Sequence, residues 1–339
     1  MKNELRNFKN QLLFNHECLF RAYYRTANLL SIHKQGGEKN IYIFSTPRSG
    51  STLLMEMIGT QSNIRMINEP LYMDRQIALS KLGDYNLLPP HWDFLLPNKD
   101  REQLLFTYFR LIEQNKVPLF NALPFSSHYA FRTDRIVFKI LRVPDMINWF
   151  EQNLNSTIVF LIRHPIANSL SRKRTPELRY FLDNEEYVDK YLDNKMVSIA
   201  KRIMKSDDKL SKAVLDWCIR NVPPLRHLDR RDWIFLTYEE LIRERIRTVD
   251  LLADRLSLRN KGRSMRRSFS PSGSSSQSDS EFQERFGEKV DRDSEWFISR
   301  WKNKIDDRRE MQLFRIIDAF EIDIYTFGHT YPSTPYLNF

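Results

Sequence analysis

An apolar strand pattern that runs directly into a short polar turn is the feature that most constrains the fold of this chain. Residues 42–54 read Tyr-Ile-Phe-Ser-Thr-Pro-Arg-Ser-Gly-Ser-Thr-Leu-Leu. Gly50 permits a sharp turn, and Ser51 and Thr52 begin a helix whose first amide groups have no partner inside the helix. Such amide groups, at the positive end of the helix dipole, attract anions. The segment therefore predicts a phosphate-binding turn.

This turn differs from the nucleotide-triphosphate loop G-x-x-x-x-G-K-[ST] in two positions. Ser45 stands where the first Gly would be, and Ser51 stands where the Lys would be. Gly50 and Thr52 are retained, and the cation is Arg48 instead. The sequence thus keeps a phosphate cradle but lacks the Lys that contacts the β- and γ-phosphates of ATP. Taken alone, the segment is also compatible with an ordinary strand–helix connection.

A second apolar run ends in an arginine. Residues 157–162 are Thr-Ile-Val-Phe-Leu-Ile, a composition typical of a strand buried in a parallel sheet. Pro165 favours the first turn of a helix, so Arg163 is expected at the carboxyl end of the strand, where open α/β sheets bind ligands. Ser171 follows eight positions later, about two turns into the next helix. Taken singly, Arg163 could be a solvated charge and Ser171 a packing residue.

Together the two segments resemble the nucleotide-binding signatures of the sulfotransferases that use 3′-phosphoadenosine-5′-phosphosulfate (PAPS). In that family the first loop holds the 5′-phosphosulfate, which the resemblance assigns here to Arg48, Ser49, Gly50, Ser51 and Thr52. An Arg and a Ser eight positions apart hold the 3′-phosphate, which the resemblance assigns to Arg163 and Ser171. The segment 233–241 is similar to the family's strand that ends in Tyr-Glu-Asp-Leu, so Tyr238 is expected near the adenine. The resemblance covers roughly residues 41–242.

The resemblance implies that a sulfuryl group moves from PAPS to a hydroxyl or amine acceptor and leaves PAP as the product. Such a transfer needs in-line positioning, stabilisation of the leaving phosphate oxygen and a base for the acceptor proton. Arg48 and the amide groups of the turn meet the second need. Lys139 lies at the end of a strand pattern, resembles the Lys-x-x-Arg segment of glycan-type members and would add a second cation. The chemistry requires no metal, and none is predicted.

Glu69 is the candidate base. It follows a strand pattern and precedes a proline, so it is expected at the carboxyl edge of the sheet. Its Glu-Pro-Leu context resembles the glycan and tyrosine sulfotransferases, whereas the cytosolic small-molecule branch uses a His. The alternatives are that Glu69 caps a turn or pairs with Arg48, and that His91 or His128 is the base. His164, next to the second signature, is expected to be structural.

Strand patterns that alternate with helical stretches predict an α/β fold with a central parallel sheet flanked by helices. The strands are expected at 41–45, 64–67, 136–140, 157–162 and 233–237. Residues 1–36 are expected to form an N-terminal amphipathic helical extension that packs onto the core or contacts a membrane or partner. Residues 37–339 are expected to form one sulfotransferase domain, with cap insertions at about 71–130 and 175–212.

Residues 259–281 are first basic and then rich in serine. This composition is typical of a flexible linker or a phosphorylatable loop. In the family that the sequence resembles, a basic loop after the last core strand folds over the 3′-phosphate, which would make Arg267 a contact. Both interpretations stay open at this stage.

The charge and the cysteine content of the chain limit which ligands and which cellular compartment are expected. The 339 residues include 53 Lys and Arg against 43 Asp and Glu, a net charge of +10, which favours anionic ligands such as a nucleotide, an acidic acceptor or a membrane surface. Cys18 and Cys218 are too few for a disulfide scaffold and indicate buried thiols. The N-terminus has no long apolar stretch, so a cytoplasmic enzyme is expected, with a small-molecule, lipid or glycan acceptor and no predicted membrane association.

Two other function classes remain as alternatives. A P-loop kinase or NTPase would use the same kind of cradle, but the Lys is missing at Ser51 and no strand-terminal Asp is suited to Mg²⁺. A basic nucleic-acid-binding protein is suggested by the run 172–174. Charge runs are usually solvated, and aromatic-basic interleaving of an RNA-binding kind is missing, so no nucleic acid is predicted as a partner.

Overall fold

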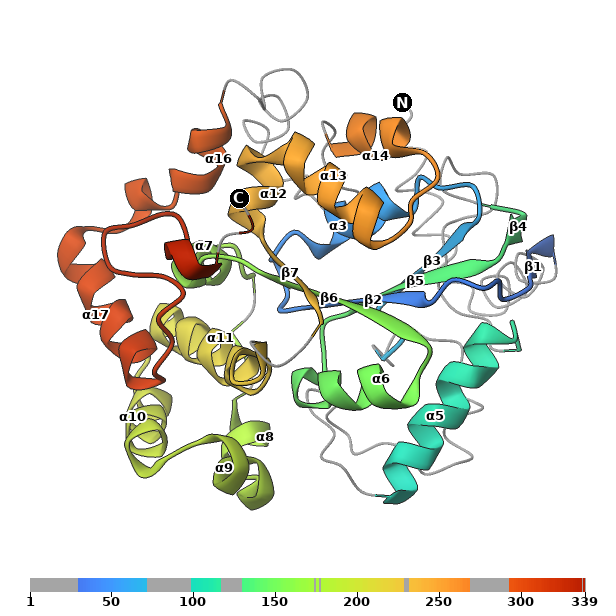
Figure 1. Cartoon of the computed structure of the whole chain (residues 1–339). Helices are drawn as coiled ribbons and strands as arrows, with labels where there is room; N and C mark the ends of the chain where they lie inside the picture. The colour runs from blue at the N-terminus through green and yellow to red at the C-terminus, as the bar shows by residue number, and fades with distance from the viewer. Residues whose placement is uncertain are drawn as a thin grey trace, which may run out of the picture.

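The centre of the molecule is a parallel β-sheet with helices on both faces (Figure 1). The computed structural model describes residues 30–71, 99–116, 130–173, 175–176, 178–228, 232–268, 293–336 and 338. Within these ranges the sheet has five parallel strands in the order β3-β5-β2-β6-β7. The strands are β2 (Asn40–Ser45), β3 (Ile64–Asn68), β5 (Arg135–Ile140), β6 (Ser156–Ile162) and β7 (Ile234–Thr237). Each lies within one residue of its expected position at both ends, and the fold class is confirmed.

The helices form two layers over the sheet and a further group beyond its carboxyl edge (Figure 1). One face carries α3 (Ser51–Ile58), α12 (Tyr238–Arg243), α13 (Arg245–Arg255) and α14 (Lys261–Ser268). The other face carries α5 (Lys99–Glu113), the short η3 (Pro144–Met146) and α6 (Ile147–Asn153). The remaining group comprises α7 (Pro165–Leu170), α8 (Arg179–Leu182), α9 (Glu185–Tyr191), α10 (Asn194–Lys205), α11 (Lys209–Leu225), α16 (Ser294–Ser299), η5 (Lys302–Lys304), α17 (Asp307–Ala319) and η6 (Thr334–Tyr336).

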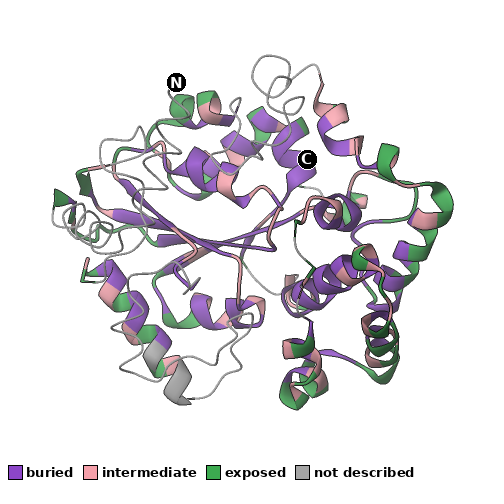
Figure 2. Cartoon of the chain, turned by 180° about the vertical axis from the view of Figure 1, so that it is seen from behind, coloured by how far each residue is buried: buried purple, intermediate pink, exposed green. Residues whose placement is uncertain are grey.

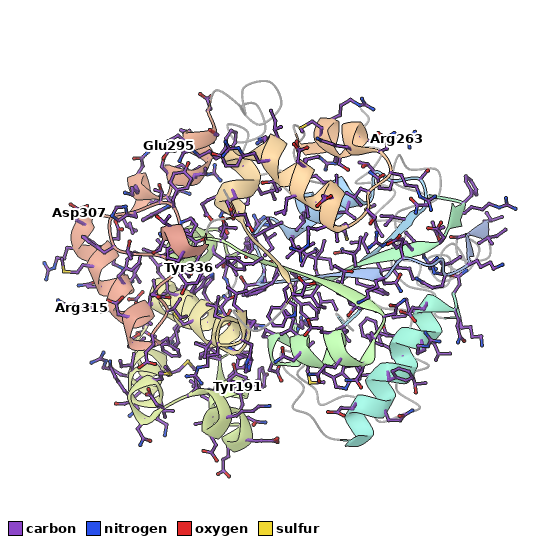
Figure 3. The ribbon with its side chains drawn as sticks, in the orientation of Figure 1. Tyr191, Arg263, Glu295, Asp307, Arg315 and Tyr336 are labelled. Carbon is purple, nitrogen blue, oxygen red and sulfur yellow. The ribbon has the colours of Figure 1, made fainter. Side chains whose placement is uncertain are left out.

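Alternation along the central strand explains why both faces are covered. Tyr42 and Phe44 belong to an aromatic cluster under α5 and α6, in which the Tyr42 and Phe138 rings stack at 4.5 Å. Ile41 and Ile43 belong to the aliphatic cluster under α3 and α13. Because both sets are fully buried, the strand reads as a continuous apolar run. Figure 2 shows the buried sheet, and Figure 3 shows outer side chains such as Arg263 and Asp307 that extend outward from the covering helices.

The strand order places a topological switch point at the carboxyl end of β2. From β2 the chain passes through α3 to β3 on one side of the sheet, while β6 and β7 lie on the other side. Ligands of open α/β sheets bind where the chain changes sides in this way. The turn between β2 and α3 (residues 46–50, hereafter the β2–α3 turn) lies at this point.

Three local expectations were wrong. Ile32–His33 forms strand β1, paired with β4 (Arg132–Thr133), so the N-terminal helix does not continue to its expected end; residues 1–29 lie outside the described residues. Helix α14 occupies part of the segment 259–281, where a flexible loop was expected, because it packs on α3; residues 269–281 lie outside the described residues. Helix α7 ends at Leu170, so Ser171 is its C-cap and does not lie inside the helix.

Other expectations concern the caps, the cysteines and the membrane. In the segment 71–130, helix α5 buries Tyr108 and Phe109 in the core, so this part covers the sheet. Cys218 is a fully buried free thiol, as expected, whereas Cys18 lies outside the described residues. Among the helices that the structure describes, none is both long and apolar enough to cross a lipid bilayer.

Candidate functional site

Gly50 is required by the geometry of the β2–α3 turn. Its φ of 91° lies in the left-handed region, and a Cβ at this position would lie 2.6 Å from the Tyr238 ring. The sharp turn predicted from the sequence is therefore present, and it brings the chain into α3 at Ser51 with no acidic residue in the first turn of the helix. The first amide groups of α3 have no partner within the helix, so the local charge at its start favours an anion.

Arg48 also holds a left-handed backbone, with a φ of 74°, although it is not a glycine. Such a conformation costs free energy and persists where the surrounding structure imposes it, often at a ligand site. The Arg48 carbonyl accepts a hydrogen bond from Arg163 Nη1 at 3.1 Å. The two predicted signatures are thus in direct contact, and the strained arginine belongs to that contact.

Asn168 fixes the β2–α3 turn from the side of α7 and was not predicted. Its Nδ2 donates to the Pro47 carbonyl at 2.9 Å and to Ser49 Oγ at 2.9 Å. Ser49 Oγ in turn lies 2.9 Å from Thr46 Oγ1. The predicted ligand residue Ser49 is buried and used in this network, so it shapes the turn. A polar residue in a short apolar helix beside the second signature was the available sequence signal.

Three arginines gather beside the turn. The Arg163 carbonyl accepts from Trp217 Nε1 at 3.0 Å, and the Arg163 guanidinium lies 4.2 Å from the centre of the Tyr238 ring. Burial lowers the pKa of Arg48, and the nearby positive charges of Arg163 and Arg300 lower it further. The Nε atoms of Arg48 and Arg163 are buried without a hydrogen-bond partner among the described residues. Convergent cations with unused donors are the arrangement expected of an anion site.

Arg300 was missed in the sequence because it is distant in the chain and lies in a segment that matches the family only loosely. It follows α16 and precedes Trp301, whose ring stacks on His164 at 4.3 Å. Through this stacking the C-terminal segment packs against His164, the residue next to Arg163 in the second signature. Burial lowers the pKa of His164 to about 3, so the ring is uncharged and packs in the core, which fits its expected structural role.

Glu239 is a buried acidic side chain whose charge interacts with that of Arg163, and both of its carboxylate oxygens already accept hydrogen bonds. They accept from the Tyr325 hydroxyl at 2.7 Å and from the His164 backbone amide at 3.1 Å. Burial raises the pKa of Glu239, and the neighbouring Arg163 opposes that shift. The Glu239 carboxyl group therefore links the segments that follow β6 and β7 to the C-terminal segment. The Arg163 Nε atom has no hydrogen-bond partner among the described residues.

Lys139 joins the turn to the candidate base. Its Nζ donates to Thr52 Oγ1 at 3.1 Å and forms an ion pair with Glu69 Oε1 at 3.1 Å. The Lys139 side chain is 5% exposed and that of Glu69 is 28% exposed, so only the carboxylate is open to an incoming molecule. Of the predicted catalytic residues, the structure brings Lys139 and Glu69 together as an ion pair.

The backbone of Glu69 is strained in the same way as that of Arg48. Its φ is 49°, it precedes Pro70, and its amide donates to the Lys139 carbonyl at 2.9 Å. A residue before proline is normally extended, so the left-handed conformation is imposed by this position next to β5. The side chain is thereby directed to the Lys139 ammonium group.

The other predicted residues lie around this centre or outside it. Ser171 Oγ donates to the Asn168 carbonyl at 2.7 Å, and Tyr238 is a buried ring between Arg163 and Gly50. Arg267 forms an ion pair with Glu56 on α3. Their assignment to a nucleotide stays a prediction, as does that of the other turn residues. His91 and His128 lie outside the described residues.

No metal-binding cluster of three or more His, Cys, Asp or Glu side chains occurs in the part of the chain that the structure describes. The cations of the site are supplied by arginine and lysine side chains.

No protein-family model and no curated protein sequence matches this chain significantly. Solved structures do show a likeness. The sulfotransferase domain from the olefin synthase of Synechococcus PCC 7002 is 15% identical, with a TM-score of 0.43 over 87% of this chain and 99% of that chain. The sulfotransferase domain from the curacin biosynthetic pathway is 17% identical, with a TM-score of 0.36 over 67% of this chain and 76% of that chain.

A third similar structure is retinol dehydratase in complex with androsterone and the inactive cofactor PAP. It is 14% identical, with a TM-score of 0.35 over 84% of this chain and 81% of that chain.

Proposed function

We propose that this protein is a sulfotransferase that moves a sulfuryl group from PAPS to a hydroxyl or amine acceptor. The observation that carries the proposal is that two sets of cationic side chains lie at the carboxyl edge of the same sheet, the arginines Arg48 and Arg163 and the lysine Lys139. Arg48 and Arg163 have unused buried donors beside the β2–α3 turn, and Lys139 links Thr52 of that turn to Glu69. In this proposal an anionic donor and the proton-accepting group would lie next to each other.

The nucleotide would bind along the carboxyl ends of β2 and β6. The amide groups of the turn and Arg48 would hold the 5′-phosphosulfate, and Arg163 and Ser171 would hold the 3′-phosphate. Arg300 is added to this set because its charge reaches Arg48. The buried Nε atoms of the two turn-facing arginines fit this use, since a phosphate oxygen would give each a charge-assisted hydrogen bond.

PAPS would supply the transferable sulfuryl group. Glu69 would remove the acceptor proton as the acceptor oxygen or nitrogen bonds to sulfur and the bond from sulfur to the 5′-phosphate oxygen breaks, leaving PAP. Lys139 lies between Thr52 and Glu69, so its charge would stabilise the sulfuryl oxygens in the transition state. Arg48 would stabilise the departing phosphate. The acceptor would be a small molecule, a lipid or a glycan.

Calorimetry with PAP, adenosine 5′-phosphate and ATP tests the nucleotide assignment. PAP should bind best, and Arg163→Ala should weaken PAP by about 30-fold to 1000-fold, the equivalent of about 2–4 kcal/mol for a charge-assisted bond to a phosphate. Adenosine 5′-phosphate, which has no 3′-phosphate, should lose far less. Arg308→Ala, at an exposed arginine on α17, is the matched control. Equal losses for both nucleotides, or a preference for ATP, would contradict the proposal.

A further inference from the structure

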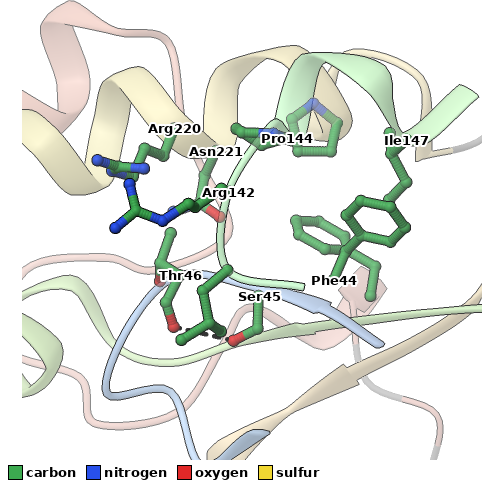
Figure 4. A pocket seen from close by; sticks show the side chains of 11 residues that line it. Phe44, Ser45, Thr46, Arg142, Pro144, Ile147, Arg220 and Asn221 are labelled. Carbon is green, nitrogen blue, oxygen red and sulfur yellow. Dashed lines mark hydrogen bonds between the residues drawn. The ribbon is translucent and has the colours of Figure 1, made fainter. Parts of the chain in front are cut away.

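A groove between two outer helices offers far more space than the small cavity beside the β2–α3 turn. That cavity, whose lining includes Ser45 and Thr46, leaves about 10 Å³ for the centre of a water-sized sphere, room for about one water molecule (Figure 4). The groove lies between α10 and α17 and has about 270 Å³ by the same measure. Figure 1 shows both helices at the outer edge of the molecule, with α11 between them and the sheet. The residues that line the groove are not those of the candidate site.

The floor of the groove is apolar. Ile199 and Ile203 contribute to it from α10, and Ile316 contributes from α17. Ile203 and Ile316 are each 7% exposed and belong to the main hydrophobic core, so their side chains are held in place, while Ile199 is partly exposed. A fixed apolar surface at the bottom of a groove favours the hydrocarbon part of a ligand.

The walls of the groove are cationic. Arg202 from α10 and Arg309 and Arg315 from α17 line it, and no carboxylate is found among the described residues of its lining. Arg309 is already paired, because its Nη2 donates to Asp208 Oδ1 at 2.6 Å and its Nη1 donates to Gln312 Oε1 at 3.1 Å. Although burial acts in the opposite direction, hydrogen bonds from Arg309 and from the start of α11 lower the pKa of Asp208 to about 2. This ion pair therefore persists at neutral pH.

Arg202 and Arg315 have no such counter-ion. Both side chains are exposed, and neither guanidinium group forms an ion pair or a hydrogen bond with a described residue. Lys201 and Lys205 extend the positive surface along α10, which contains no acidic residue. The helix dipole explains cations in the last turn of α10, but Arg315 lies outside the last turn of α17. The groove therefore has an uncompensated positive charge that attracts an anion.

We propose that this groove binds an anionic amphiphile, a molecule with one carboxylate on a short hydrocarbon chain. The carboxylate lies between Arg202 and Arg315, which come from opposite helices, and the chain lies on the isoleucine floor. The volume of about 270 Å³ is just below the range of about 300–1,000 Å³ that is typical of small-molecule pockets. This size suits a single medium-chain acid better than a lipid bilayer. The proposal is independent of the sulfuryl transfer proposed above.

Octanoate, octanamide and acetate separate the two parts of the proposed ligand. Octanamide keeps the chain without the charge, and acetate keeps the charge without the chain. Each is titrated into the protein at constant ionic strength, below the concentration at which octanoate aggregates, and its binding is followed by NMR. Octanoate should bind about 4-fold to 25-fold more tightly than octanamide, because each of two exposed ion pairs contributes a factor of about two to five. It should bind at least about tenfold more tightly than acetate, the factor that the burial of two methylene groups supplies.

Three variants assign the binding to the groove. The double variant Arg202→Gln with Arg315→Gln should bind octanoate and octanamide equally, and each single variant should retain part of the preference. Ile199→Ala should weaken both probes while octanoate stays preferred, because it removes part of the floor. Arg308→Gln, at an exposed arginine of α17 that does not line the groove, is the matched control and should change neither affinity. Thermal unfolding shows that each variant is folded, and the single variants give the comparison if the double variant is not.

Several outcomes would overturn the proposal. Equal affinities of the wild-type protein for octanoate and octanamide would do so, as would a preference for octanoate that survives in the double variant. The octanoate affinity should be the same with and without PAP, and a loss on addition of PAP would place the probe in the nucleotide site. Binding to vesicles that contain an anionic lipid, without binding of octanoate, would identify a membrane surface instead. None of these results depends on whether the protein transfers a sulfuryl group.

Discussion

At the scale of single residues, Arg48 and Glu69 share an unusual property. Both are non-glycine residues in the left-handed region, with φ values of 74° and 49°, and both lie at the carboxyl edge of the sheet. Each such conformation costs about 1–3 kcal/mol and is retained only where the surroundings impose it. Both residues carry a charged side chain of the proposed site, so the strain supports the proposal that they act there.

Glu69→Gln tests the base directly. The variant keeps the shape of the side chain but removes the basic oxygen, so turnover with the first accepted acceptor should fall by about 10²–10⁴ while PAP affinity is nearly unchanged. Calorimetry with PAP and steady-state turnover measure the two quantities separately. The exposed Glu321→Gln is the control. If PAP affinity fell together with turnover, Glu69 would be a brace for Lys139, and unchanged turnover would exclude it as the base.

Asp145 gives a second residue-scale prediction, on stability. It is buried in η3, and burial raises the pKa of its carboxyl to about 8, with Lys190 opposing and Glu186 reinforcing the shift. The folded chain therefore keeps a proton that the unfolded chain releases above its ordinary pKa of 3.8. By linkage, the contribution of this group to stability falls as pH rises from about 4 to 8.

Asp145→Asn should remove this pH dependence because an amide does not ionise. Urea denaturation of both proteins at pH 5 and pH 8 measures the effect. The variant should gain stability relative to the wild-type protein at pH 8 and differ much less at pH 5. A stability difference that is the same at both pH values would contradict the shifted ionisation.

At the scale of elements, α14 is fastened to α3 by a nearly buried ion pair. The side chains of Arg267 and Glu56 are 12% and 10% exposed. Removing one partner of such a pair leaves an uncompensated charge and costs about 3–5 kcal/mol, whereas replacing both costs little. Arg267→Met alone should therefore destabilise the chain, and Glu56→Leu added to it should restore much of the loss.

The same pair of variants assigns Arg267. If its role is the ion pair with Glu56, the double variant should bind PAP as the wild-type protein does. If Arg267 contacts the 3′-phosphate, both variants should lose PAP affinity whatever their stability. Calorimetry on the two folded variants decides between the roles.

The strands were predictable from the sequence, whereas α14 was not. Strands β2 and β6, for example, are largely apolar runs with several β-branched residues and are buried on both faces, and this composition is visible locally. Helix α14 reads Lys-Gly-Arg-Ser-Met-Arg-Arg-Ser, a poor helix sequence that is formed because Ser264 and Ser268 pack and bond against other elements. Such tertiary support leaves no periodic signal in the chain.

The residues of the candidate site also fall into two groups, those that the sequence identifies and those that it does not. Gly50 and Arg163 could be identified because turn chemistry and the end of a strand are local features. Asn168 and Arg300 could not, because their roles depend on which segments the fold brings together.

At the scale of the whole molecule, the net charge of +10 is consistent with the anionic ligands proposed. Because Arg48, Arg163 and Lys139 supply the positive charge at the site, PAP binding and sulfuryl transfer should persist after treatment with EDTA. Activity before and after dialysis against the chelator, and after re-addition of Mg²⁺, measures this. Activity lost with EDTA and restored by Mg²⁺ would favour a kinase or NTPase.

Helix α11 holds the second signature in place. Trp217 donates to the Arg163 carbonyl at 3.0 Å, so the position of this helix sets where the carboxyl end of β6 lies. Because a packed helix moves as a unit, a change in the packing of α11 would shift the Arg163 backbone with it. The proposed 3′-phosphate site would therefore depend on side chains that never touch the nucleotide.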